Sequence, residues 1–126
     1  MQLKMRWIGF KEKICMKILV VTKSPGEKAK SVSIDNNLKS FQKLLNGGYL
    51  QALPRAAFPD LKEYIVYCDE DGYAKELPFH FSLFQGTDAV VGSTIVSKVN
   101  NDGDSVSLSD DEVSTICKYL DSLTGV

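Results

Sequence analysis

A single histidine, His80, is the residue on which most acid–base or nucleophilic chemistry in this chain would depend. A serine or cysteine nucleophile needs a neighbouring base and a further group that orients that base. His80 stands between Phe79 and Phe81, a setting that favours packing at the edge of the core over proton transfer. Carboxylate pairs such as Asp69 and Asp71 lie in turns or at helix starts, where acids accept from backbone N–H groups. We therefore expect a protein that is not an enzyme, with a hydrolase or transferase using His80 as the least favoured reading.

The cysteines do not form a pattern that would bind a metal or a cofactor. Cys15, Cys68 and Cys117 are widely spaced, no Cys-x-x-Cys pair occurs, and one histidine is too few to complete a zinc site. An odd number of cysteines also argues against a disulfide framework and favours a reducing, cytoplasmic setting. The segment 22–26 contains lysine, serine and glycine, but not in the order of a phosphate-binding loop. We expect no metal and no cofactor.

Binding of an anionic ligand, such as a nucleotide, is the chemistry for which the sequence offers the most groups. Basic side chains pair with phosphate, and aromatic rings offer stacking surfaces. The candidate ligand-binding residues are Lys23, Lys28, Lys30, Tyr49, Arg55, Phe79, His80 and Phe81. The competing interpretation is that the lysines are solvated on a hairpin and the aromatic rings belong to the core. The aromatic segment 77–84 is likewise either core or a protein-binding surface.

Charge is distributed unevenly along the chain, although the net charge is only −1. Residues 1–48 carry a balance of +7, and residues 49–126 carry −8. If the two halves form separate surfaces, this asymmetry favours self-association into a homo-oligomer, or an anionic partner on the basic side. If the halves interleave in space, the asymmetry disappears. The basic half also supports the alternative that the protein is a nucleic-acid-associated regulator.

The length of 126 residues and the 44% hydrophobic content suit one domain with a real core. No apolar run is long enough to cross a membrane, and the N-terminus does not resemble a secretory signal. Residues 1–15 differ from the rest, because aromatic and basic side chains alternate there without a clear period. We expect them to be an N-terminal extension, either a translated leader before Met16 or a basic arm. Residues 16–126 then form a single domain.

Local patterns predict the elements of this domain. Strands at 17–24 and 29–34 flank a Pro-Gly turn and form a hairpin. Asp35 is expected to cap a helix whose apolar side chains are Leu38, Phe41, Leu44 and Leu45, and which ends at Asn46-Gly47-Gly48. Further strands are expected at 49–53, 63–68, 73–75, 89–97 and 106–108, with 77–84 as a packed loop or short helical turn.

The last predicted element is a helix that begins with a capping box formed by Ser109 and Glu112 and ends at Gly125. The complete order is β-β-α-β-β-β-β-β-α. Runs of strands with two separated helices favour an α+β fold, with an antiparallel-rich mixed sheet, over a doubly wound one.

The chain from Met16 to residue 123 resembles a family of small domains of unknown function found in bacteria, phages and conjugative elements. The residues that carry the resemblance are the opening MKILVV strand, Asn46-Gly-Gly-Tyr49, the stretch YIVYCDEDGYAKELP (64–78) and Val-Val-Gly92. Members usually carry an asparagine shortly after the Leu-Pro pair. Phe79-His80-Phe81 stands there in this chain, so no ligand role of that asparagine carries over.

The resemblance implies a non-enzymatic role in a phage or mobile element. Together with the charge layout, it leads us to expect a binding protein that counteracts host defence. It would do so by binding a host protein or by sequestering a nucleotide signal.

Overall fold

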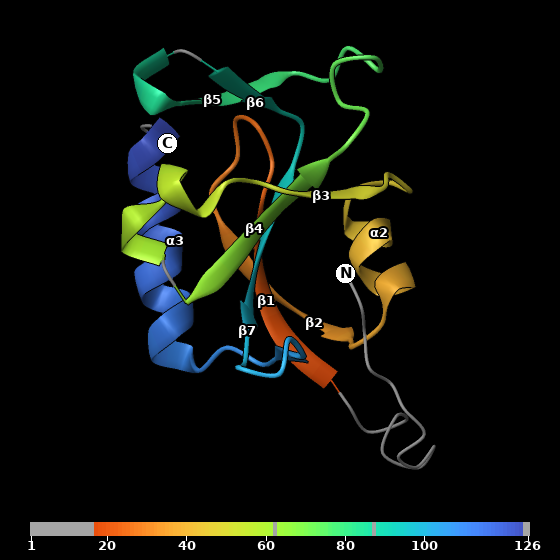
Figure 1. Cartoon of the computed structure of the whole chain (residues 1–126), viewed down its shortest axis with the longest axis vertical. Helices are drawn as coiled ribbons and strands as arrows, with labels where there is room; N and C mark the ends of the chain where they lie inside the picture. Colours follow the sequence, from red (N-terminus) through yellow and green to blue (C-terminus); the bar gives the residue numbers. More distant parts are fainter. Residues whose placement is uncertain (1–16, 62, 87, 125–126) are drawn as a thin grey trace.

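An antiparallel sheet of six strands forms the centre of the protein (Figure 1). The computed structural model describes residues 17–61, 63–86 and 88–124. The path of strands across the main sheet is β2 (Lys30–Asp35), β1 (Lys17–Lys23), β7 (Thr94–Val99), β4 (Tyr64–Asp69) and β3 (Leu50–Ala52), and β8 (Ser105–Val106) also pairs with β7. A second sheet contains β5 (Phe79–Leu83) and β6 (Asp88–Val91). Every strand pair is antiparallel, and the predicted α+β class is confirmed.

The two described helices cover opposite faces of the main sheet, as Figure 1 shows. Successive residues of a strand point to opposite faces, so Val20 and Val21 enter two different clusters of buried side chains. The cluster on one face includes Phe41 of helix α2 (Leu38–Leu44). The cluster on the other face includes Ile116 and Leu120 of helix α3 (Asp110–Thr124), and the β5–β6 sheet adds side chains to it. The core therefore consists of two layers separated by the sheet.

The ends of the helices confirm two local predictions and correct a third. The capping box of α3 is present, because Ser109 N donates to Glu112 Oε1 over 2.9 Å and Glu112 N donates to Ser109 Oγ over 3.1 Å. Helix α2 ends as expected, with Gly47 N donating to a carbonyl in the last turn. The prediction that Asp35 caps α2 is wrong. Asp35 is the last residue of β2, and Asn37 accepts from Ser40 N over 2.8 Å instead.

Three predictions in the middle of the chain are also wrong. Residues 73–75 do not form a strand, because hydrogen bonds between near neighbours close 69–77 into consecutive turns. Segment 77–84 is neither a loop nor a helical turn, since most of it is β5. The single strand predicted at 89–97 is divided into β6 and β7, which belong to different sheets. The division occurs at Gly92, whose φ of +80° ends the extended run.

Short 3-10 turns complete the fold at Arg55–Ala57, Pro59–Leu61 and Phe84–Gly86. No helix within the described ranges is long and apolar enough to cross a membrane. The predictions for residues 1–15 and for a helix end at Gly125 concern residues outside the described ranges.

Candidate functional site

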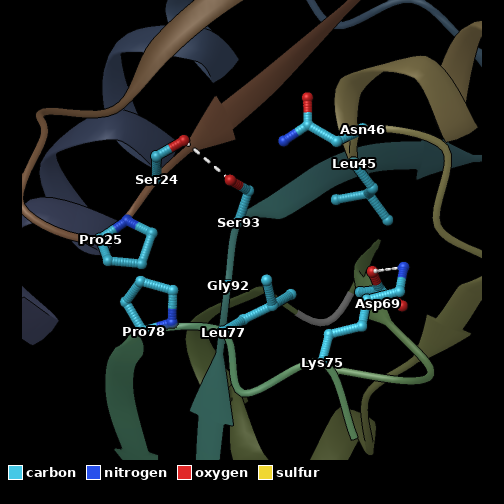
Figure 2. A pocket seen from close by; sticks show the side chains of 10 residues that line it. All are labelled: Ser24, Pro25, Leu45, Asn46, Asp69, Lys75, Leu77, Pro78, Gly92 and Ser93. Carbon is cyan, nitrogen blue, oxygen red and sulfur yellow. Dashed lines mark hydrogen bonds and ion pairs between the residues drawn. The ribbon is translucent and has the colours of Figure 1, made fainter. Parts of the chain in front are cut away.

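A cavity of about 490 Å³ opens where four separate segments of the chain meet (Figure 2). The segments are the turn after β1, the end of α2, the loop after β4 and the junction between β6 and β7. A volume of this size lies in the range of small-molecule sites. The residues that line it are Ser24, Pro25, Leu45, Asn46, Asp69, Lys75, Leu77, Pro78, Gly92 and Ser93.

The end of α2 forms one wall of the cavity, and its shape depends on an unusual backbone. Asn46 and Gly47 have positive φ angles of 55° and 89°, which asparagine and glycine tolerate better than other residues. The chain then passes so close to β4 that a Cβ on Gly48 would lie 2.3 Å from Asp69 Oδ2. Glycine at 48 therefore allows α2 and the end of β4 to meet at the cavity.

A second glycine shapes the opposite wall. Gly92 N donates to Pro78 O over 2.7 Å, which links the β6–β7 junction to the residue before β5. A Cβ at Gly92 would lie 2.7 Å from Leu77 Cδ1. Any larger residue at 92 would have to displace the Leu77 side chain, and the φ of +80° disfavours residues that carry a Cβ.

Asp69 and Lys75 provide the charge of the cavity. The Asp69 side chain is only 3% exposed, and its Oδ2 accepts from Lys75 Nζ over 2.7 Å. Its Oδ1 accepts from Asp71 N over 2.9 Å and so holds the turn that brings Lys75 back. Among the described lining residues these two are the ionised ones, so the positive and negative charges of the cavity balance.

Ser24 and Ser93 form a polar edge, with their hydroxyl oxygens 2.8 Å apart (Figure 2). Asn46 lies across from them and adds a carboxamide with two donors and one acceptor. Below the serine pair in Figure 2 lie the apolar side chains of Pro25, Pro78 and Leu77. Apolar walls with a few convergent polar groups are typical of binding sites for small molecules.

The predicted ligand-binding lysines do not come together at this cavity. Lys23 is buried, with a side chain that is 0% exposed, and its Nζ lies 2.8 Å from Asp121 Oδ1. It also donates to Glu27 O. Lys28 and Lys30 are exposed on the β1–β2 hairpin. The competing interpretation of solvated hairpin lysines therefore describes Lys28 and Lys30, whereas Lys23 belongs to an internal ion pair.

The predicted aromatic and arginine residues are also dispersed. Phe81 lies in the core and packs edge-on against Phe58, with ring centroids 6.1 Å apart. Phe79 and Tyr49 are 59% and 62% exposed, and Arg55 is exposed on its 3-10 turn. Segment 77–84 is thus partly core and partly surface, and none of the eight predicted residues lines the cavity.

His80 is buried beside Thr94, with Nε2 3.4 Å from Thr94 Oγ1. Burial lowers its pKa, which favours the neutral imidazole. The group next to Nε2 of His80 is the buried hydroxyl of Thr94. Cys68 is buried as well, and burial together with the adjacent Asp69 raises the pKa of its thiol to about 11. Neither group is placed to act on a molecule in the cavity.

The sequence reasoning missed the polar residues of the cavity, although a signal for them was present. Three of the four stretches that carry the resemblance contribute lining residues, namely Asn46, several residues between Asp69 and Pro78, and Gly92, whereas the opening MKILVV strand contributes none. No three His, Cys, Asp or Glu side chains among the described residues gather closely enough to hold a metal ion.

These observations define a small α+β domain with a charge-balanced cavity between its two sheets. A family model described as "Domain of unknown function (DUF3846)" matches residues 16–123. The chain therefore belongs to the DUF3846 family, and the expected resemblance is confirmed at that level. No curated protein and no solved structure matches the chain.

Proposed function

We propose that this protein is a non-enzymatic binding protein that holds a small ligand in the cavity at the β6–β7 junction. The observation that carries the proposal is that three of the four family-like stretches contribute residues to this one cavity. Two close approaches of backbone, at Gly48 and Gly92, keep its walls in place. Apolar walls with a few polar groups, in a cavity of about 490 Å³, support a small ligand at this place.

A setting in a phage or mobile element, and a role against host defence, belong to the same proposal and rest on the resemblance. Sequestering a signal molecule requires only a binding site, and the cavity offers one. Self-association and a cytoplasmic location also stay predictions. Binding of a host protein would use exposed aromatic side chains such as Phe79 and Tyr73, which are 59% and 64% exposed.

The proposal can be tested by screening a library of small fragments against isotope-labelled protein and following backbone amide signals by NMR. Ligands that enter the cavity will shift the amides of Asn46, Gly92 and Ser93. The variant Ser24→Phe fills the opening and will abolish these shifts. Ser33→Phe, on an exposed residue of the edge strand β2, is the matched control and will leave them unchanged.

The outcomes separate the candidate functions. Fragments that shift no cavity amide, or that bind a folded Ser24→Phe variant unchanged, would contradict a cavity ligand. Retention of DNA that weakens steeply with salt would instead support the nucleic-acid regulator, because phosphate contacts release counterions.

A further inference from the structure

The charges of the cavity limit what its ligand can carry. Lys75 Nζ is already bonded to Asp69, whose carboxylate is almost fully buried. A phosphate or carboxylate entering the cavity would meet the Asp69 carboxylate together with the Lys75 ammonium that already neutralises it. The charges of the cavity therefore give an anion no net attraction. They favour a ligand whose inserted part is uncharged.

The walls indicate a flat ligand. Pro25 and Pro78 lie on one side of the opening, next to Leu77 (Figure 2). Proline rings are rigid, so two of these apolar surfaces keep a fixed shape, and Leu77 lies close to Gly92 beside them. A planar ring fills such a space with little loss of its own conformational entropy.

The polar groups indicate a ring with hydrogen-bonding edges. The Asn46 carboxamide offers a donor and an acceptor side by side, which is the pattern that pairs with the edge of a nucleobase. The Ser24–Ser93 hydroxyl pair provides a further donor and acceptor. A purely apolar ring would make no hydrogen bond to the Asn46 carboxamide, whereas a ring with polar edges can pair with it.

We infer that the cavity binds an uncharged planar heterocycle of the nucleobase type, with any charged substituent remaining in solvent. This inference rests on the proposed function and names its ligand class. It also revises the predicted anion site, because recognition comes from Asn46, Ser24 and Ser93 and not from the hairpin lysines.

The test uses adenosine, guanosine, cytidine and uridine beside their 5′-monophosphates, with amide shifts and titration calorimetry of the full chain. At least one nucleoside will shift the amides of Asn46 and Ser93. The monophosphate of that nucleoside will bind no more than about threefold tighter than the nucleoside. The affinity of the monophosphate will change less than about twofold between low and moderate salt, because its phosphate makes no contact with the protein.

The variant Asn46→Gly removes the carboxamide and still accepts the positive φ at this position. It will weaken nucleoside binding about tenfold, the usual effect of losing a two-point contact to a base. Asn101→Gly, in the exposed turn between β7 and β8, is the control and will bind like the parent protein.

Three results would overturn the inference: no nucleoside shifts a cavity amide, Asn46→Gly binds normally, or monophosphates bind far more tightly with shifts at Lys28 and Lys30. If other fragments occupy the cavity while all nucleosides fail, the proposed function stands and only the ligand class is refuted.

Discussion

The ion pair between Lys23 and Asp121 joins the end of β1 to α3 and leads to the sharpest prediction about stability. The Lys23 side chain is 0% exposed, and the Asp121 side chain is 24% exposed. Asp121 Oδ1 also accepts from Ala29 N over 2.9 Å. In Asp121→Asn, the side-chain oxygen can still accept from Ala29 N, but the buried ammonium loses its counter-charge.

Removing one partner of a buried pair costs about 3–5 kcal/mol. Because Asp121 is partly exposed, we expect the lower end, about 3 kcal/mol, for Asp121→Asn. That is a large share of the roughly 5–15 kcal/mol that stabilises a domain, and it corresponds to a melting temperature lower by about 10 °C. The measurement is urea and thermal unfolding followed by circular dichroism.

The double variant Lys23→Met/Asp121→Asn separates the loss of the pair from the cost of the orphaned charge. It buries no charge, so we expect it to be more stable than Asp121→Asn alone. Asp111→Asn, on an exposed residue of the same helix, is the control and should change stability by less than about 1 kcal/mol. If Asp121→Asn behaves like this control, or if the double variant is the least stable, the reasoning is refuted.

The hydrogen bond from Lys23 is the main reason that the pKa of Asp121 is lowered, followed by the bond from Ala29 N. A lowered pKa stabilises the fold above the ordinary carboxyl pKa, and this contribution is lost as the pH falls through the folded-state value. The parent protein will therefore lose more stability than Asp121→Asn when the pH falls from about 5 to 2.

Three further predictions concern single positions. Gly48→Ala places a methyl group against Asp69 and will lower the free energy of unfolding by about 2 kcal/mol. Gly103→Ala meets no neighbour within 4 Å and will lower it by about 1 kcal/mol, because of the positive φ at that position. Urea unfolding of the two variants measures the difference. Burial would raise the pKa of Glu112, but hydrogen bonds from its neighbours outweigh this effect and hold the pKa at about 2. Glu112→Gln will therefore be less stable than the parent protein at about pH 7. The variant will also lose less stability than the parent protein when the pH falls from about 5 to 2. With the other two cysteines replaced by serine, Cys68 will resist iodoacetamide at pH 8 until urea unfolds the protein, because its thiol is buried and has a pKa of about 11; rapid labelling of the native protein would contradict this.

Elements that depend on local signals could be predicted from the sequence. The capping box at Ser109 and the Asn46-Gly47-Gly48 helix end involve residues within a few positions of each other, and both are present. The division of 89–97 could not be predicted, because a continuous β-rich run looks the same whether it stays in one sheet or crosses into another. At the point of division, Gly92 N donates a hydrogen bond to Pro78 O, and this contact exists only once the β5–β6 sheet has folded beside the main sheet.

The site was harder to predict because its groups come from distant parts of the chain. Lys23 resembles an exposed hairpin lysine until Asp121, 98 positions away, is brought beside it. Ser24 and Ser93 are 69 positions apart and look like ordinary turn residues when taken separately. The family-like stretches indicated the right region, but the sequence alone did not show that they meet.

The crossing of one continuous chain from the small sheet to the large one at Gly92 has a mechanical consequence. The small sheet cannot tilt relative to the large one without moving Gly92 and Ser93, and both line the cavity. Movement of the small sheet would therefore change the shape of the cavity. Phe79, the first residue of β5, directly follows the lining residue Pro78, so its exposed side chain would move together with this wall.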